Sequence, residues 1–226
     1  MFERPDANAW DRGYDGPSIR LGIGPRRGWY LRCVRIAVLA SGSGTVLEAI
    51  LADGIPVSLV VVDRPSRAIE VAEAHGVAAR LMERSGYGDD FDRVAYTNEV
   101  VDILLAAEID LVVMAGFGTV FAEPIHEAFE HRILNTHPAL LPAFRGWHAV
   151  REALARGVKV TGCTIHVATL EVDAGPILAQ EAVAVLDDDD EASLHERIKA
   201  VERRLYPATI RAVIADPTIL KKEPHS

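Results

Sequence analysis

The sequence has few cysteines, no excess of positive charge and no long uninterrupted apolar run. Its two cysteines, Cys33 and Cys163, have no neighbours at metal-ligand spacing. They predict reduced, structural thiols of a cytoplasmic protein, and nothing in the sequence supports a disulfide between them. No run approaches the roughly 20 apolar residues of a membrane-spanning helix, so we expect no membrane partner. The net charge of −9 argues against a nucleic-acid partner, although a local site for one phosphate remains open.

The chain is expected to contain one domain between two irregular ends. About half of its residues are hydrophobic, which predicts a substantial core. Residues 1–33 are rich in Gly, Pro, Arg and Asp, without periodicity or the apolar segment of a secretory signal, and they predict an irregular or disordered arm; an over-early start codon is the alternative. We therefore expect a single domain over residues 34–216 and a C-terminal tail over 217–226.

Short apolar runs alternate with helical patterns from Val34 onward. Strands are predicted at residues 34–40, 56–63, 77–82, 110–116 and 132–135, with helices from near Thr45 and at 67–76, 91–108 and 123–129. After these we expect a helix at 147–157, two strand runs at 158–168 and 176–186, and a helix at 191–215 that is interrupted at Pro207. Strands that are apolar throughout and alternate with helices predict a doubly wound α/β fold with a mainly parallel sheet.

A glycine loop lies between the first strand and the first helix. Gly42 and Gly44 in "SGSG" permit a tight turn and allow backbone N–H groups to approach an anion. The pattern also suggests a nicotinamide dinucleotide site, with Asp63 as the ribose-binding acid. However, Leu47 occupies the third glycine position of that motif, so we favour a phosphate-binding loop over a dinucleotide site.

Polar residues gather at the predicted ends of other strands. Asn135 and His137 follow the fifth strand, Asp173 lies on a glycine loop between two later strands, and Thr164 lies on a strand run that would pass nearby. Each also has a structural interpretation, as a turn former, a buried histidine or a β-branched strand residue. Together they suit a reaction in which negative charge develops on a carbonyl oxygen, with Asp173 raising the pKa of the imidazole. We find no nucleophile elbow and no metal-ligand spacing, so we expect direct transfer without a metal.

Several longer motifs resemble the phosphoribosylglycinamide formyltransferase family, within the formyltransferase superfamily. They are "LNTHPALLPAF", "KVTGCTIHV", "VDAGPILAQ" and "ERRLYP", in that order, and the resemblance spans Val34 to about Ile214. It implies the formyltransferase fold, with a Rossmann-like N-terminal half. It also implies transfer of a formyl group from 10-formyltetrahydrofolate, as co-substrate, to the amine of glycinamide ribonucleotide in purine biosynthesis. The partners would be these small molecules, and the protein a monomer or homodimer.

The resemblance also implies roles for individual residues. The catalytic residues would be Asn135, His137 and Asp173, with Thr164 holding a catalytic water. Contacts to the ribonucleotide would come from Gly42, Ser43, Gly44, Thr45, Val46 and Glu202. Contacts to the folate would come from Arg93, Gly118, Thr119, Val120, Phe121 and Asn135.

The sequence departs from the family at several of these positions. Thr45 and Val46 replace the usual Ser-Asn, which removes a polar contact to the nucleotide. Gly118 and Thr119 replace Met and a basic residue, which is expected to widen the folate wall and remove a cation. Arg145 replaces a proline, as in methionyl-tRNA formyltransferases.

Other functions remain open at this stage. Methionyl-tRNA formyltransferase and formyltetrahydrofolate deformylase would need further domains, which we do not expect. A hydrolase acting on the same folate, a non-catalytic binding module and, least of all, a nicotinamide-dependent dehydrogenase are the alternatives.

Overall fold

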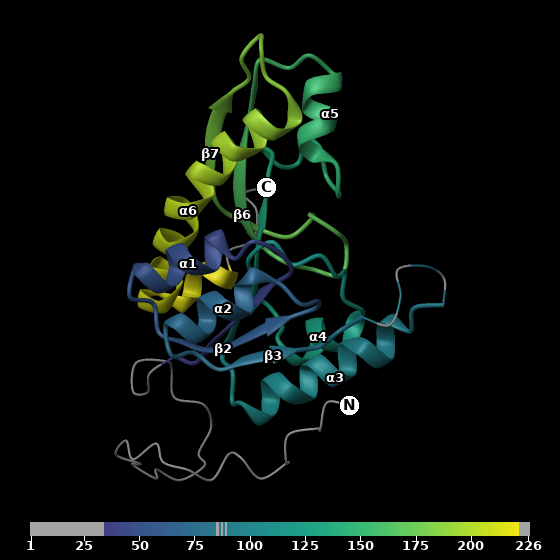
Figure 1. The fold of residues 1–226 in the computed structure, drawn as a ribbon, viewed down its shortest axis with the longest axis vertical. Coiled ribbons are helices and arrows are strands. Elements are labelled where there is room, and N and C mark those ends of the chain that lie inside the picture. Colours follow the sequence, from purple (N-terminus) through teal and green to yellow (C-terminus); the bar gives the residue numbers. More distant parts are fainter. Residues whose placement is uncertain (1–33, 85, 87, 89, 222–226) are drawn as a thin grey trace.

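The computed structural model describes residues 34–84, 86, 88 and 90–221, which form a seven-stranded sheet with helices on both faces (Figure 1). The strand order is β3-β2-β1-β4-β5-β6-β7, and the first five strands in this order are parallel. The two remaining strands are antiparallel to their neighbours. The strands are β1 (Ile36–Ala40), β2 (Val57–Val62), β3 (Ala79–Leu81), β4 (Leu111–Met114), β5 (Ile133–His137), β6 (Val160–Val167) and β7 (Ile177–Ala184).

Both faces of the sheet are buried, which explains why the central strands are apolar throughout. Along β1, Ile36 and Val38 point into one core cluster, whereas Ala37 and Leu39 point into the other. The first cluster lies under α1 (Thr45–Ala52), α2 (Arg67–Ala74) and α6 (Glu191–Ala215). The second lies under α3 (Arg93–Ala106) and α4 (Glu123–Ala128). The predicted doubly wound, mainly parallel fold is therefore confirmed.

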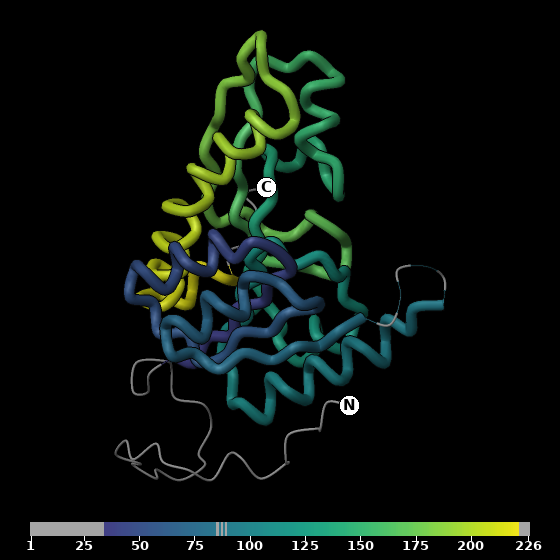
Figure 2. The backbone as a smooth tube through the Cα atoms, viewed as in Figure 1, coloured from purple at the N-terminus to yellow at the C-terminus, as the bar shows by residue number. Residues whose placement is uncertain are grey.

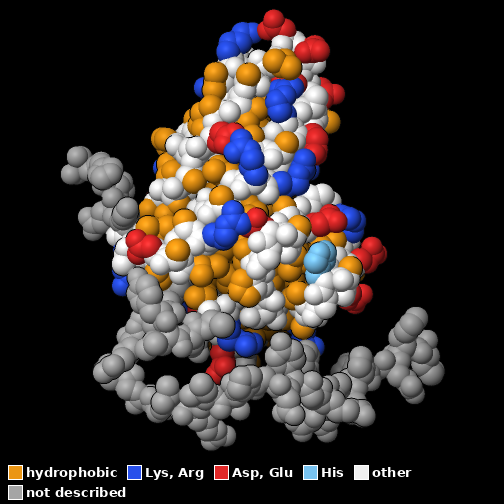
Figure 3. Space-filling model, turned by 90° about the vertical axis from the view of Figure 1, so that its left-hand side faces the viewer, with side chains coloured by type: hydrophobic (Ala, Val, Ile, Leu, Met, Phe, Trp, Pro, Cys, Tyr) orange, Lys and Arg blue, Asp and Glu red, His pale blue; other side chains and the backbone are white. Residues whose placement is uncertain are grey.

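An arm extends from this body, made by β6, β7, α5 (Ala149–Ala155) and the first half of α6 (Figure 1). Residues 160–163 of β6 pair with β7 alone, because the last residue of β5, His137, pairs with Thr164 of β6. Helix α6 then runs from the arm back to α1 on the body, as the backbone trace in Figure 2 shows. On the face seen in Figure 3, Lys and Arg side chains lie among Asp and Glu side chains along the arm.

Two of the predicted elements, the fifth strand and the last helix, differ from the structure. Strand β5 continues to His137, two residues beyond the predicted strand, so Asn135 and His137 lie within the sheet. Helix α6 is continuous, so the predicted interruption at Pro207 is wrong. Buried Tyr206 and Ile210 hold the helix against the core on both sides of the proline.

The structure describes the chain up to residue 221 at its C-terminal end, whereas its description begins only at residue 34. The 3-10 helix η2 (Pro217–Lys221) packs Leu220 into the core, so ordered structure continues past residue 216, where we expected a tail to begin. The arm predicted for residues 1–33, with Cys33, lies outside the described residues. Within the described part of the chain, no helix has both the length and the apolar character needed to cross a membrane.

Candidate active site

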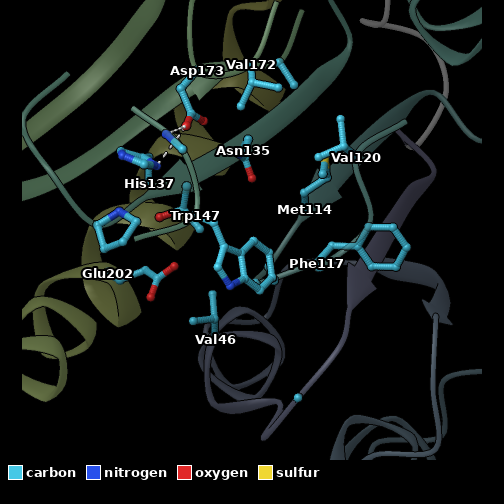
Figure 4. Close-up of a pocket in the computed structure, with 18 of the residues that line it drawn as sticks. Val46, Met114, Phe117, Val120, Asn135, His137, Trp147, Val172, Asp173 and Glu202 are labelled. Carbon is cyan, nitrogen blue, oxygen red and sulfur yellow. Dashed lines mark hydrogen bonds and ion pairs between the residues drawn. The ribbon is translucent and has the colours of Figure 1, made fainter. Parts of the chain in front are cut away.

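A cavity of about 710 Å³ lies at the carboxyl ends of β1, β4 and β5. It is lined by the glycine loop, by the segment after β4 and by Asn135 and His137. The loop before β7, with Asp173, and the cavity-facing side of α6 complete it (Figure 4). The predicted convergence of these strand ends is therefore present, as expected of the carboxyl edge of a parallel sheet.

His137 and Asp173 form an ion pair at this edge. Nδ1 of His137 lies 3.2 Å from Oδ2 of Asp173, and both side chains are almost fully buried. Nε2 of His137 lies 2.7 Å from the carbonyl oxygen of Phe144. The same carboxylate accepts a 2.8 Å hydrogen bond from the backbone N–H of Gly146, and its Oδ1 lies 3.5 Å from Nε2 of His166. The pair is thus held by the loop after β5 and by β6.

Burial and hydrogen bonding act in opposite directions on the protonation of this pair. Burial lowers the pKa of His137 below its usual value, and the Asp173 carboxylate and the Phe144 carbonyl oppose that shift without cancelling it. Burial alone would raise the pKa of Asp173, but hydrogen bonds from His166 and from the Gly146 N–H, together with the charge of His137, bring it below its usual value. We expected Asp173 to raise the pKa of His137. Its effect has that sign, but the net shift is downward because desolvation is larger.

Asn135 points into the cavity beside His137 (Figure 4). In the antiparallel register of β5 and β6, Asn135 lies opposite His166, and its Nδ2 is 3.2 Å from Nε2 of that histidine. Nδ1 of His166 lies 3.0 Å from the carbonyl oxygen of Val167. Nε2 of His166 thus lies within reach of both the Asn135 amide nitrogen and the Asp173 carboxylate.

Thr164, which was predicted to hold a water, is not among the residues that line the cavity. Its hydroxyl is buried, donates to the carbonyl of Ala139 at 2.6 Å, and accepts from the Leu141 N–H at 3.1 Å and from Gln180 Nε2 at 2.9 Å. One donor and two acceptor positions are all that a hydroxyl provides. Thr164 therefore fixes the loop that follows His137.

The glycine loop and Glu202 line one side of the cavity. Gly44 has φ +69°, and a Cβ there would lie 3.0 Å from the Cα of Ala68, so this position requires glycine. No side chain caps α1, and its first N–H groups face the cavity region lined by Gly42, Ser43, Gly44, Thr45 and Val46. Val46 is buried in the core. Burial raises the pKa of Glu202, although a hydrogen bond with Thr136 opposes this.

The segment from Gly118 to Phe121 lines the opposite side. Phe121 is mostly buried and stacks on Phe117, with ring centroids 5.2 Å apart, whereas Val120 is 45% exposed. Thr119 is buried and donates a 2.8 Å hydrogen bond to Oδ2 of Asp63. Asp63 also forms ion pairs with Arg64 and Arg84. Asp63 is thus occupied within the protein, which removes the acid needed for the dinucleotide alternative.

Trp147 is a cavity residue that the sequence did not single out. Its side chain is 73% exposed and reaches into the middle of the cavity (Figure 4). A Cβ on Gly118 would lie 3.3 Å from Cη2 of Trp147, so the indole fills the space beside that glycine. The indole therefore occupies part of the space that a side chain at position 118 would take. Further lining residues that the sequence did not indicate are His126, Arg151, His166, His195 and Lys199.

Two other predictions concern groups outside the cavity lining. Arg93 is the first residue of α3, where its side chain is exposed, and it does not line the cavity. Its contact to a ligand that projects beyond the cavity stays a prediction. Cys163 is buried with a free thiol, whose pKa burial raises to about 12. Among the described residues, no three His, Cys, Asp or Glu side chains are grouped so that they could hold a metal ion.

Comparisons with known proteins agree with one another. A model of the formyl transferase family matches residues 34–210. A phosphoribosylglycinamide formyltransferase of Mycobacterium tuberculosis is 46% identical over 184 residues, covering 79% of this chain and 84% of that protein. The crystal structure of glycinamide ribonucleotide transformylase 1 from Symbiobacterium toebii is 43% identical with a TM-score of 0.76, covering 80% of this chain and 88% of that one. That of phosphoribosylglycinamide formyltransferase from Bacillus halodurans is 39% identical with a TM-score of 0.74, covering 81% and 96%.

Proposed function

The chain belongs to the formyl transferase family, among its phosphoribosylglycinamide formyltransferases, and on that premise we propose how its own residues perform the reaction. The formyl group passes from 10-formyltetrahydrofolate to the amine of glycinamide ribonucleotide, a step of purine biosynthesis. The observation that supports this most is the convergence of Asn135, His137 and Asp173 with the uncapped N-terminus of α1 in one cavity. A cytoplasmic location is part of the same proposal.

Asn135 and His137 would stabilise the charge that develops during transfer. The amine nitrogen attacks the formyl carbon, and the C=O double bond becomes a single bond to a negatively charged oxygen. The amide of Asn135 and the imidazole of His137 would donate hydrogen bonds to this oxygen. Since Nε2 of His137 lies 2.7 Å from the Phe144 carbonyl, the formyl oxygen would have to replace that carbonyl. The loop after β5 therefore has to shift when the substrates bind.

Asp173 and His137 would also move the one proton that the reaction transfers. The attacking amine must lose a proton, and the folate nitrogen must gain one as its bond to the carbon breaks. Asp173 is a carboxylate at neutral pH, because its pKa is below the usual value, and can accept the first proton. His137, 3.2 Å away, would deliver a proton to the leaving nitrogen. Thr164 has no part in this step, because its hydroxyl is fully used within the protein.

The two sides of the cavity suit the two substrates. The N–H groups at the start of α1 would bind the phosphate, which suits both their hydrogen bonding and the helix dipole. Glu202 would accept a hydrogen bond from a ribose hydroxyl. On the other side, Val120 and Val172 are each 45% exposed within the cavity lining and would contact apolar ring surface of the folate. Both partners of the protein are thus small molecules.

One assay separates this function from its alternatives. The protein is incubated with 10-formyltetrahydrofolate, with and without glycinamide ribonucleotide, and released tetrahydrofolate is measured. We expect turnover that requires the ribonucleotide, with one formylated ribonucleotide per tetrahydrofolate. Equal turnover without the ribonucleotide would identify a folate hydrolase, and binding without any turnover would identify a binding module.

A further inference from the structure

The cavity contains an aromatic surface that the proposed mechanism does not use, the indole of Trp147. Most of this side chain is exposed, although large aromatic side chains are usually well covered in folded proteins. The exposed part faces the cavity between the ribonucleotide side, with Val46 and Glu202, and the folate side, with Phe117 (Figure 4). A flat apolar surface in this position can bind a second flat ring.

The neighbours of Trp147 in the chain connect its loop to the catalytic pair. The N–H of Gly146 donates to Asp173, and Arg145 forms a 3.0 Å ion pair with Glu171 on the loop that carries Asp173. The carbonyl of Phe144 contacts His137. The indole is therefore attached to the same backbone segment that holds the catalytic pair.

Gly118 and Trp147 depend on one another for space. A Cβ on Gly118 would lie 3.1 Å from Arg64 Nη2, 3.3 Å from Ser41 Oγ and 3.3 Å from Trp147 Cη2. The N–H of Gly118 also donates a 2.6 Å hydrogen bond to Ser41 Oγ, which holds the Gly118 backbone against that serine. A side chain at position 118 would press against the Arg64 guanidinium, the Ser41 hydroxyl and the indole, each of which would have to give way. Glycine at this position thus permits the indole to lie against the folate side of the cavity.

We propose that Trp147, made possible by Gly118, is a specificity-determining residue that stacks on the aminobenzoyl ring of the formylfolate. This inference rests on the proposed function, which places the formyl carbon beside Asn135 and His137. The aminobenzoyl ring is bonded directly to the nitrogen that carries the formyl group, so the ring lies next to the formyl carbon. Trp147 supplies the large aromatic face in this part of the cavity lining, and Val120 and Val172 provide smaller apolar contacts.

The first test measures coupling between the indole and the ligand ring. Binding of 10-formyldideazafolate is compared with binding of a counterpart whose benzene ring is replaced by cyclohexane, by calorimetry and without ribonucleotide. Trp147→Ala should raise the Kd for the aromatic ligand roughly twofold to tenfold, as expected for one aromatic pair, and should affect the saturated ligand clearly less. Trp147→Phe should retain most of the affinity. Equal losses for both ligands, or equal losses in the Ala and Phe variants, would contradict the stacking.

The second test exploits the shared space. Gly118→Met alone should displace the indole and raise the Kd, whereas Gly118→Met combined with Trp147→Ala should bind better than the product of the single changes predicts. Strictly additive losses would show that the two positions are independent. The Trp10→Phe/Trp29→Phe variant, in which Trp147 is the remaining tryptophan, should change its fluorescence on binding the aromatic ligand; an unchanged spectrum would overturn the inference.

These measurements are separate from turnover. A wild-type protein that binds the analogue through Trp147 but transfers no formyl group would disprove the proposed function and leave the stacking intact. Turnover that needs the ribonucleotide, with no effect of Trp147→Ala on folate affinity, would disprove the stacking alone. Absence of any binding of the analogue to the wild-type protein would disprove the stacking as well.

Discussion

At the scale of single residues, Asp173 controls the protonation of His137. The carboxylate lies 3.2 Å from Nδ1 and opposes the downward pKa shift that burial causes. Asp173→Asn should therefore lower the pKa of His137 further and reduce kcat at least about a hundredfold. The pKa is measured by NMR titration of labelled histidine. Asp187→Asn, which alters an exposed carboxylate on the arm, is the control and should change neither quantity. An unchanged His137 pKa would contradict the coupling.

His137 itself is the residue on which the chemistry depends most. Its replacement by alanine removes a hydrogen-bond donor to the developing oxyanion and the acid for the leaving nitrogen, so turnover should fall by about 10²-fold to 10⁴-fold or more. The folded structure should persist, as judged by circular dichroism and gel filtration. His75→Ala, an exposed histidine at the end of α2, should keep full activity. Near-normal activity of the His137 variant would disprove the mechanism.

The proximity of Asn135, His137 and Asp173 could be predicted because it follows from chain direction. Parallel strands end at one edge, and alternation along β5 directs residues 135 and 137 to the same side. Trp147 and His166 could not be found in this way. The position of Trp147 depends on the path of an irregular loop, and the contact of His166 with Asn135 depends on the antiparallel register of β6. A single sequence specifies neither the loop path nor the register by its periodicity.

At the scale of elements, Thr164 joins β6 to the loop after β5. Thr164→Val keeps the shape of the side chain but leaves the Leu141 N–H and Gln180 without that acceptor and the Ala139 carbonyl without that donor. The free energy of unfolding should fall by about 1–3 kcal/mol, measured by urea denaturation. Thr164→Ser retains the hydroxyl and should be much closer to wild type. If the valine variant were as stable as wild type but inactive, Thr164 would have a catalytic role after all.

Helix α1 begins at a residue that only glycine can occupy without strain. Gly44→Ala places a side chain at φ +69° and 3.0 Å from the Cα of Ala68, so it should destabilise the protein by about 2 kcal/mol. It should also raise KM for the ribonucleotide, because the N–H groups of α1 shift. Gly42→Ala is the matched control for stability, since a Cβ there meets no atom within 4 Å. Equal stability of the two variants would contradict this account, and thermal denaturation measures the difference.

Helix α6 shows what periodicity cannot decide. A proline inside a helix removes one backbone hydrogen bond, so an interruption at Pro207 was a reasonable expectation. The observed helix remains continuous because residues before and after the proline are buried in the same core cluster. Tertiary packing therefore outweighs the local preference, and the part of the helix before the proline carries Lys199 and Glu202, which line the cavity.

At the scale of the whole molecule, the cavity lies between the body and elements that the arm contributes. The body supplies the glycine loop and the ends of β4 and β5, whereas α6 supplies His195 and Glu202. Building a site between these parts buries ionisable groups that a surface would leave exposed. Burial lowers the pKa of His126, His137 and His195, all of which line the cavity, and raises that of Glu202.

These shifts predict how stability depends on pH. Below the unperturbed histidine pKa of 6.5, the unfolded chain binds protons that His126, His137 and His195 of the folded protein do not bind. The free energy of unfolding should therefore decrease as the pH falls below 6.5, by at most about 1.4 kcal/mol per pH unit for each histidine, and level off above it. Glu202 acts in the opposite direction. Its folded pKa is raised above 4.5, so its contribution is greatest at low pH and is lost as the pH rises through the folded value.

Urea denaturation between about pH 5 and pH 7.5 tests this balance. The three histidines should outweigh the one carboxylate, so stability should rise with pH across the lower part of this range. His126→Gln should flatten the rise, because one of the neutral buried imidazoles is gone. Glu202→Gln should steepen it, because the opposing group is removed while the helix is retained. A stability that falls from pH 5 to pH 6.5 in the wild-type protein would show that Glu202, rather than the histidines, dominates the electrostatics of the cavity.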